Sequence, residues 1–306
     1  MRSLLVGSHN IMHGIFLPEL LPAYARLHRE RGVGALCLQE CSHSAASAVA
    51  RALGPRFAAA WHPVACGLAV VYDRTRLVPR RRSAIGLPRL TRVPRWQWAY
   101  TSKTPEQRWA LAVRFAPRRA AGHAAGRCSA TLVSFHLDAA GDLAHRTRQM
   151  RALSHALTSE IPHSAPLVAC GDTNAFTLLR KAAEPALAAL LQPLVRRHRA
   201  RDAALAAGPA RPADTHHFAR AREPKLGHRL AVAAGALGVD LPRRYDVICT
   251  ARCTVLRAGL VDTPASDHQL VWAELKLRPR AGGREARSAI GYGSSGKWPL
   301  RYIASE

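Results

Sequence analysis

The sequence predicts a mixed α/β or α+β sandwich built around a single core. Short apolar runs rich in Val, Leu and Ile recur from end to end of the 306-residue chain, and clusters of Gly, Pro or Arg bound them, which is typical of β-strands. Segments with apolar residues near every 3.6 positions lie between these runs, as in amphipathic helices. Strands mixed with helices over residues 4–277 favour one layered domain rather than an all-α or all-β fold.

Eight apolar runs are expected to form strands, and four periodic segments are expected to form helices. The expected strands are residues 4–6, 35–38, 68–72, 109–115, 130–135, 167–170, 245–250 and 269–277. The expected helices are residues 17–31, 44–53, 143–158 and 178–191. Because 48% of the residues are hydrophobic, the chain has enough apolar side chains to bury a sizeable core.

Residues 1–277 are expected to form one catalytic domain that carries two long basic insertions. The first, near 78–108, is rich in Arg, Pro and Trp and places Trp96 and Trp98 beside Arg95. The second, near 195–244, contains basic clusters and the pair His216-His217. Long loops are usually functional or mobile, and basic side chains among aromatics suit a nucleic-acid strand. Solvated loops held by a buried tryptophan are the alternative. Residues 278–306 are expected to form a flexible tail.

The charge balance is the strongest global signal. The chain has 45 Lys and Arg residues against 20 Asp and Glu, a formal net charge of +25. Such a field attracts polyanions, and the guanidinium group suits phosphate contacts. Coding bias toward arginine would also enrich this residue without any function. Nucleic acid, DNA or RNA, is the first partner to consider, and an anionic phospholipid surface is the second.

Cysteine usage and the lack of long apolar runs favour a cytoplasmic location. Seven cysteines are spread through the chain, and several lie within apolar runs, where reduced cysteine behaves as a small hydrophobe. The equal spacing of Cys37/Cys41 and Cys249/Cys253 is weak support for zinc, because structural zinc sites show tighter ligand groups. No run approaches the length of a membrane span, and the N-terminal run is too short for a signal peptide.

Polar residues stand repeatedly at the ends of the apolar runs. The stretch "LVACGDTNAF" ends a run with Asp172 and Asn174, one residue apart, and Gly171 reads as an ordinary turn glycine. The other polar residues placed in this way are Asn10, Glu40, His136, Asp138, Asp246, Asp267 and His268. One such placement is unremarkable, but the series indicates a single site at one edge of a sheet.

In these stretches the sequence resembles the endonuclease/exonuclease/phosphatase superfamily. The matching stretches, in the family's order, are "SHNI", "LCLQE", "GLAVVYD", "SFHLDA" followed by "RTRQ", "ACGDTN", "YDVI" and "SDHQLVWAEL", which together cover residues 3–277. The resemblance implies a four-layered α/β/β/α sandwich of two mixed β-sheets flanked by helices, with the active site at one edge.

The resemblance also implies a role for each matching residue. Glu40 would be the principal Mg²⁺ ligand (Mn²⁺ is the alternative ion), with Asn10 supporting the site through its amide oxygen or a water and Asp267 as a further ligand or bridge. Asp172 would orient or deprotonate the attacking water, and Asn174 would hold a phosphate oxygen. Asp246 would brace His268, which would stabilise charge on the phosphoryl group.

His136 distinguishes branches of the superfamily. A histidine at this place is typical of the deoxyribonuclease and neutral sphingomyelinase branches, where it helps to protonate the leaving oxygen, whereas abasic endonucleases carry a tyrosine. The carboxylate partner of this histidine has no clear counterpart, and Glu106 is offered only at a shifted position. Arg146 and Gln149 match an Arg-x-x-Gln pattern that serves either substrate contact or helix packing. Arg146, Trp96 and Arg108 are the substrate-binding candidates.

The resulting hypothesis is a Mg²⁺-dependent phosphodiesterase, first of all a nuclease that cleaves DNA or RNA by in-line attack of water. A phosphohydrolase for a lipid head group or a phosphoinositide is the alternative, which a basic face would also recruit. A catalytically silent nucleic-acid-binding protein is the third reading. The sequence leaves open the substrate, endo- or exo-attack, the number of metal ions and the oligomeric state.

Overall fold

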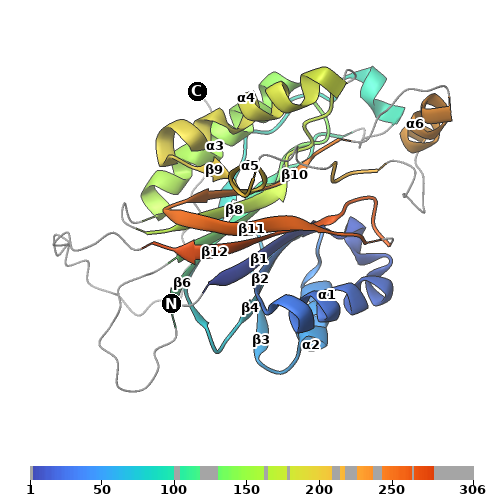
Figure 1. Cartoon of the computed structure of the whole chain (residues 1–306). Coiled ribbons are helices and arrows are strands. Elements are labelled where there is room, and N and C mark those ends of the chain that lie inside the picture. The colour runs from blue at the N-terminus through green and yellow to red at the C-terminus, as the bar shows by residue number, and fades with distance from the viewer. Residues whose placement is uncertain are drawn as a thin grey trace.

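A computed structural model of the chain describes residues 3–99, 104–117, 130–161, 165–177, 180–208, 214–217, 226–236, 243–263 and 265–278. Two six-stranded sheets lie face to face, and a pair of helices covers the outer face of each (Figure 1). Each sheet contains both parallel and antiparallel pairs. The predicted four-layered sandwich of two mixed sheets is therefore confirmed.

The first sheet has the strand order β11-β12-β1-β2-β4-β3. Its strands are β1 (Leu4–Asn10), β2 (Val33–Gln39), β3 (Phe57–Trp61), β4 (Leu68–Asp73), β11 (Cys253–Val261) and β12 (Leu270–Leu277). The second sheet has the order β5-β6-β7-β8-β10-β9. Its strands are β5 (Leu77–Gly86), β6 (Trp109–Pro117), β7 (Ala130–His136), β8 (Leu167–Asp172), β9 (Arg201–Asp202) and β10 (Asp246–Ala251). The parallel pairs, β1 with β2 and β7 with β8, lie at the centres of the two sheets.

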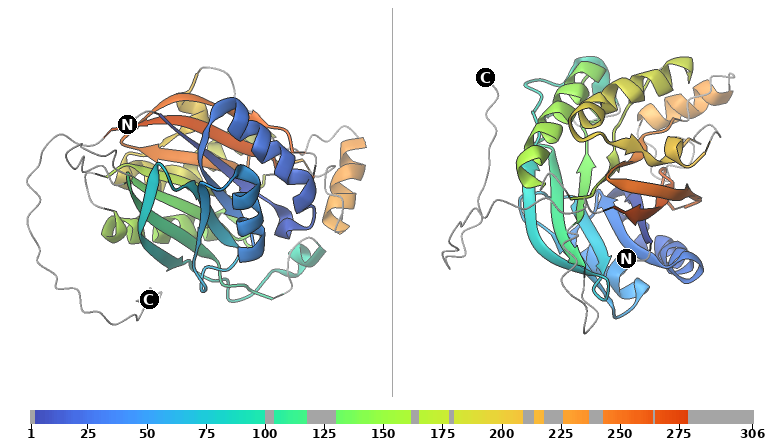
Figure 2. Two further views of the ribbon diagram at one scale, coloured as in Figure 1. Left: turned by 90° about the horizontal axis from the view of Figure 1, so that it is seen from below. Right: turned by 60° about the vertical axis from the view of Figure 1, so that its left-hand side comes forward.

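Helices α1 (Leu17–Arg31) and α2 (His43–Leu53) cover the first sheet, and α3 (Leu143–Glu160) and α4 (Arg180–His198) cover the second (Figures 1 and 2). Local chemistry fixes their ends. Ser42 and Asp142 cap α2 and α3 by accepting backbone N–H groups, and Gly32 ends α1 in the left-handed conformation that glycine adopts freely. The shorter helices are η1 (Met12–Gly14), η2 (Arg95–Ala99), α5 (Ala203–Ala206) and α6 (Leu226–Ala236).

Three apolar clusters hold the four layers together, one at each interface. Side chains of a strand point alternately to its two faces, so each central strand contributes side chains to two clusters. In β8, Val168 and Cys170 pack between the sheets, whereas Leu167 and Ala169 pack under α3 and α4. This double burial explains why the central strands read as continuous apolar runs in the sequence.

The structure changes the bounds of the two expected insertions and the role of Gly171. Residues 77–86, expected to open the first insertion, form the edge strand β5, and α4 continues to His198, inside the second expected insertion. Gly171 is not a turn residue, because it lies within β8, where an added Cβ would come within 2.1 Å of the carbonyl oxygen of Phe135. The close approach of β7 and β8 is what requires glycine there. The expected tail, residues 278–306, lies outside the described residues except for Arg278.

Among the described helices, none is both long enough and apolar enough to cross a membrane. In the described part of the chain, Cys37, Cys41, Cys66, Cys170 and Cys249 are free thiols.

Candidate active site

The ends of five strands from both sheets meet at one edge of the sandwich. Asn10 is the last residue of β1, and Glu40 directly follows β2. In the second sheet, Asp172 ends β8 and pairs in register with His136, at the end of β7, and with Asp246, at the start of β10. Since the carboxyl ends of parallel strands lie at the same edge, the fold brings these distant residues together.

Asp172 lies at the centre of this group. The Asn10 Nδ2 atom donates to Asp172 Oδ2 at 3.1 Å and to Glu40 Oε1 at 3.2 Å, and so links the two sheets. The same Asp172 oxygen is 3.5 Å from His136 Nε2 and 3.7 Å from His268 Nε2. Asp172 is 1% exposed, so its carboxylate depends on these partners rather than on solvent.

A hydrogen-bonded chain braces His268 from behind. Its Nδ1 donates to Asp246 Oδ2 at 2.8 Å, and the hydroxyl of Thr215 donates to the same oxygen at 2.7 Å. The Thr215 hydroxyl in turn accepts from the backbone N–H groups of Tyr245 and Asp246. This arrangement fixes the ring so that Nε2 faces Asp172.

The two histidines beside Asp172 differ in charge. Burial alone would lower both pKa values. For His268 the carboxylates of Asp246, Asp172 and Asp267 outweigh burial, and its pKa lies well above the ordinary value. For His136 burial dominates, the charges of Arg108 and His268 act in the same direction, and Asp172 compensates only in part, so its pKa falls to about 4. At neutral pH the site therefore contains one imidazolium ion and one neutral imidazole.

The donor set of the site fits a hard divalent cation. Its oxygen donors are the carboxylates of Glu40, Asp172, Asp246 and Asp267. Carboxylate oxygens are the ligands that Mg²⁺ prefers. The side chain of Glu40 is 22% exposed, so it is the carboxylate of the Asn10 cluster that a hydrated ion could reach.

Similarity to known proteins rests on structure. No protein-family model matches the chain, and no curated protein matches it in sequence. Among solved structures, it is similar to an endonuclease/exonuclease/phosphatase family protein from Bacteroides thetaiotaomicron, with 16% identity, a TM-score of 0.61 and coverage of 89% of this chain and 97% of that chain. The chain has the fold of the endonuclease/exonuclease/phosphatase superfamily.

Proteins with this superfamily fold act on different phosphate esters. The mannosyl-6-phosphatase Bt3783 of B. thetaiotaomicron is 15% identical, with a TM-score of 0.62 over 90% of this chain and 100% of that chain. D. rerio TDP2, complexed with a single-strand DNA product, is 15% identical, with a TM-score of 0.61 over 90% of this chain and 99% of that chain. The superfamily fold alone thus leaves the substrate open.

Two site residues have left-handed backbone conformations. Glu40 has φ of 50° and Asn174 has φ of 47°. Asparagine tolerates this region, whereas glutamate seldom adopts it, at a cost of about 1–3 kcal/mol. Asn174 is held by its backbone N–H on Asp172 Oδ1 at 2.8 Å and by its amide nitrogen on the Leu137 carbonyl oxygen at 3.0 Å. Such strain at a cluster of polar side chains is typical of functional sites in any superfamily.

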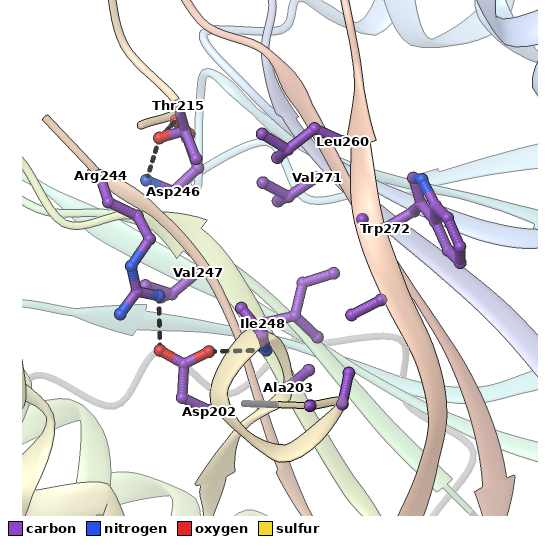
Figure 3. Close-up of a pocket in the computed structure, with 15 residues that line it drawn as sticks. Asp202, Ala203, Thr215, Arg244, Asp246, Val247, Ile248, Leu260, Val271 and Trp272 are labelled. Atoms are coloured by element: carbon purple, nitrogen blue, oxygen red, sulfur yellow. Dashed lines mark hydrogen bonds and ion pairs between the residues drawn. The ribbon is translucent and has the colours of Figure 1, made fainter. Parts of the chain in front are cut away.

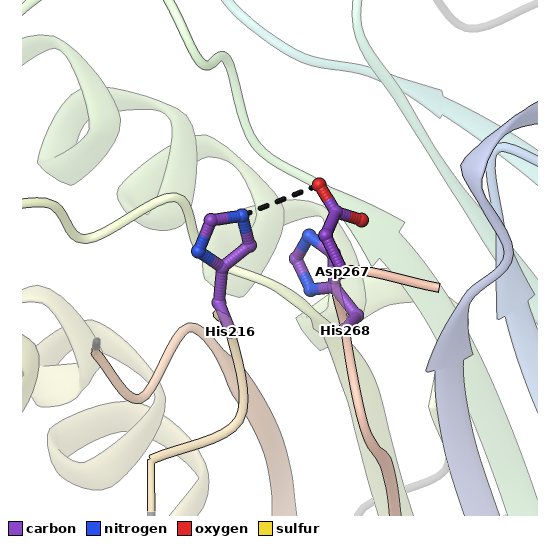
Figure 4. Close-up of side chains that lie close together, drawn as sticks. All are labelled: His216, Asp267 and His268. Carbon is purple, nitrogen blue, oxygen red and sulfur yellow. Dashed lines mark ion pairs between the residues drawn. The ribbon is translucent and has the colours of Figure 1, made fainter. Parts of the chain in front are cut away.

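The structure shows Asn10 and Asp267 in contacts that differ from the expected ones. The amide oxygen of Asn10, expected to support the ion, accepts the Met12 N–H at 3.0 Å, and its amide nitrogen faces the carboxylates. Asp267 lies beside His268 and pairs with His216, whose Nε2 is 3.4 Å from Asp267 Oδ2 (Figure 4). His216, Asp267 and His268 form a second group of possible metal ligands.

The three substrate-binding candidates differ in burial and in how far the structure describes them. Arg146 is buried and donates to the carbonyl oxygens of Asp138, Ala139 and Gly141, so it holds the loop before α3. Arg108 is half-buried. The Trp96 side chain lies outside the described part of the structure.

Arg108 also pairs with Glu106, the carboxylate that the sequence offered as a partner of His136. It pairs with Glu106 at 3.2 Å and with Asp138 at 3.4 Å. Glu106 is therefore engaged by Arg108, and the carboxylates nearest His136 Nε2 are those of Asp172 and, at 3.9 Å, Glu40.

Sequence reasoning missed several residues that position the site. Thr215 was hidden in a long insertion with no strand end to mark it. His9 lies beside Asn10 in "SHNI". Its Nε2 donates to the His268 carbonyl oxygen at 3.2 Å, and its Nδ1 accepts from the Tyr24 hydroxyl at 2.6 Å. Ser266 lies in the same β11–β12 connection as His268 and joins it to β1 by donating to the Asn10 carbonyl oxygen. Only His9 carried a signal, as a polar residue inside an otherwise apolar strand.

A cavity of about 430 Å³ lies beside the brace of His268. Thr215 and Asp246 form part of its lining, and most of the remaining wall is apolar (Figure 3). Its arginine, Arg244, donates to Asp202 at 2.6 Å and to Glu184, so its charge is already compensated. The cavity therefore does not suit a phosphate group.

Proposed function

We propose that this protein is a Mg²⁺-dependent phosphodiesterase that hydrolyses nucleic acid. The observation that carries the proposal is the buried cluster of Asn10, Asp172, Asp246 and His268, with Glu40 at its rim, assembled from strand ends of both sheets. The net charge of +25 supports a polyanionic substrate. The superfamily fold, shared with a protein bound to a DNA product, is compatible with this choice.

Asp172 and His268 have different roles in the in-line attack. Asp172, fixed by Asn10 and by the Asn174 N–H, orients the attacking water and accepts its proton. The charged ring of His268 lies within 3.7 Å of Asp172 and stabilises negative charge on the phosphoryl oxygens. Bound to Glu40 with support from Asp267, Mg²⁺ would supply further neutralisation of those oxygens and of the leaving group.

The role of His136 follows from its charge state. A pKa near 4 leaves the ring neutral at pH 7, so it is poorly suited to deliver a proton from an imidazolium ion. We assign it instead to hydrogen bonding with the leaving oxygen. The proton-donor role that the resemblance implies for His136 stays a prediction beside this assignment.

The test compares wild type with Asp172→Asn and His268→Ala on plasmid DNA, single-stranded DNA, RNA, phosphatidylinositol phosphate and mannose 6-phosphate. Wild type should cleave nucleic acid with Mg²⁺ and not with chelator. Each variant should lose about a hundredfold or more of turnover, with unchanged circular dichroism. His28→Ala, at the far end of α1, is the matched control and should remain active.

Near-native activity in both variants would remove the site assignment. Turnover of the lipid alone would replace the nucleic-acid substrate and favour the head-group phosphohydrolase, and turnover of the sugar phosphate alone would favour a sugar phosphatase. No turnover of any substrate would favour the silent binding protein.

A further inference from the structure

A basic groove runs along the outer helical layer, between α3 and α4. It has a volume of about 820 Å³. Its basic side chains, Arg151 and His155 from α3 and Arg196 and Arg197 from α4, are all exposed. The groove residues of each helix recur every three or four positions, so each set lies on one helical face. None of the residues that line the groove is acidic.

The acidic residues of these two helices are engaged elsewhere. α3 contains a single acidic residue, Glu160, which pairs with Arg81 and accepts from Ser83. α4 contains only Glu184, which accepts two hydrogen bonds from Arg244. Within the described part of the chain, no ion pair is recorded for the three groove arginines. Coding bias would scatter arginine over the surface, but it does not account for a concave face that lacks compensating acids.

The groove starts close to the candidate active site. α3 begins just after the loop that Arg146 holds, and this loop leaves β7 at His136. Thr147 lines the groove and directly follows Arg146. With a rise of about 1.5 Å per residue, Arg151 and His155 lie about 8 and 14 Å beyond Arg146 along the helix. A ligand that contacts both the candidate active site and these side chains has to extend along the helix, as a chain of several nucleotides does.

We propose that the α3–α4 groove binds the phosphate backbone of a nucleic-acid strand whose scissile bond lies at the candidate active site. The guanidinium groups pair with phosphate oxygens, and Gln192 orients one of them by accepting from Arg196 Nε at 3.1 Å. Small residues such as Ala152, Ala189 and Pro193 complete the lining. A concave surface without Phe, Tyr, Trp or large aliphatic side chains fits a strand better than it fits a bilayer. The inference rests on the proposed function and adds a second contact region to it.

The experiment measures binding apart from cleavage. Fluorescence anisotropy is recorded with a labelled 30-nucleotide and a labelled 4-nucleotide single-stranded DNA. All proteins carry Asp172→Asn and are kept in chelator, so that no cleavage occurs. The groove variant combines Arg151→Gln, Arg196→Gln and Arg197→Gln. The matched control combines Arg26→Gln, Arg29→Gln and Arg51→Gln, three exposed arginines on the helices of the opposite layer.

The groove variant should bind the 30-nucleotide strand about tenfold more weakly at 100 mM salt. Its log–log salt slope should be shallower by about 2, because each phosphate contact contributes about 0.7 for a single strand. The control variant should stay within about twofold of the parent protein, and binding of the 4-nucleotide strand should not distinguish the two variants. In the Asp172-containing background, the groove variant should hydrolyse bis(p-nitrophenyl) phosphate at the wild-type rate.

Equal losses in the groove and control variants would overturn the proposal, since charge alone would then explain binding. Loss of binding to phosphatidylglycerol vesicles with unchanged DNA binding would also overturn it, in favour of a membrane surface. Failure of the proposed function is a separate result, namely no cleavage of nucleic acid by the wild type with Mg²⁺.

Discussion

At the scale of single residues, the environment sets the chemistry of the two site histidines. His136 and His268 are both buried and both lie within 4 Å of Asp172. They differ in their second partners, because Asp246 receives the Nδ1–H of His268 while Arg108 adds to the positive field at His136. Residue type alone therefore did not reveal which ring is charged.

This difference is measurable in the metal-free protein. In an NMR titration, His268 should remain charged through neutral pH, and His136 should titrate near 4. Asp246→Asn should move the pKa of His268 downward, because it removes the nearest compensating charge while burial continues to favour the neutral ring. An unchanged pKa in Asp246→Asn would show that the brace does not set the charge of His268.

Thr215 is expected to stabilise both the fold and the site. Thr215→Val removes the donor to Asp246 and leaves two buried backbone N–H groups without their acceptor, so it should lower the free energy of unfolding by about 1–3 kcal/mol and reduce turnover. Thr131→Val is the matched control, because the Thr131 hydroxyl is buried without a recorded partner in the described structure. Urea unfolding should find this control neutral or stabilising. Equal losses in both variants would contradict the assignment.

His9 should make stability depend on pH. Burial lowers its pKa from 6.5 to about 3, so between these values the unfolded chain binds a proton that the folded protein does not. Stability from this group is thus fully present above pH 6.5 and falls as pH drops through this range, by about 1.4 kcal/mol per pH unit. His9→Gln should show a correspondingly shallower pH dependence in urea unfolding between pH 4 and 6. Parallel pH profiles for the two proteins would rule out this contribution.

At the scale of elements, burial decided what the sequence could predict. The eight expected strands correspond to β1, β2, β4, β6, β7, β8, β10 and β12, the interior strands of the two sheets. The four missed strands, β3, β5, β9 and β11, are the four edges. Edge strands have polar neighbours on one side and often carry charge or proline. β5, for example, contains Pro79 and three consecutive arginines, with an irregular register at Pro79.

The β7–β8 pair offers a test of how an element positions the site. Gly171→Ala would place a Cβ 2.1 Å from the Phe135 carbonyl oxygen, which the parallel strands cannot accept without separating. It should lower the free energy of unfolding by about 1–3 kcal/mol, and it should reduce turnover because His136 and Asp172 pair in the same register.

Gly208→Ala is the control for this prediction, since nothing lies within 4 Å of the added atom and the backbone there is not left-handed. Thermal unfolding and activity of both variants check it. Wild-type stability in Gly171→Ala would contradict the packing argument.

At the scale of the whole molecule, the site depends on long-range folding that the sequence shows only in part. Strand-end residues such as Asn10, Glu40 and Asp172 could be found because they interrupt apolar runs. The segment 214–217 could not, since it reaches the site by backbone contacts, including the Gln269 N–H donating to the Thr215 carbonyl oxygen. Such a contact has no pattern in sequence.

Because several carboxylates meet at the site, Glu40→Gln should have opposite effects on stability without and with Mg²⁺. Without metal, Glu40 adds a fourth negative charge to a partly buried cluster, and its pair with His13 contributes little, because the His13 side chain is 71% exposed. Glu40→Gln should therefore melt at the same temperature as the wild type or higher in chelator. With Mg²⁺ at about 100 times its Kd, the free energy of unfolding of the wild type should rise by about 2.7 kcal/mol. That of Glu40→Gln should rise far less, so that this variant becomes the less stable protein.

Differential scanning calorimetry across a Mg²⁺ titration measures the stability of both proteins. Equal stabilisation of the two proteins by Mg²⁺ would mean that Glu40 does not hold the ion.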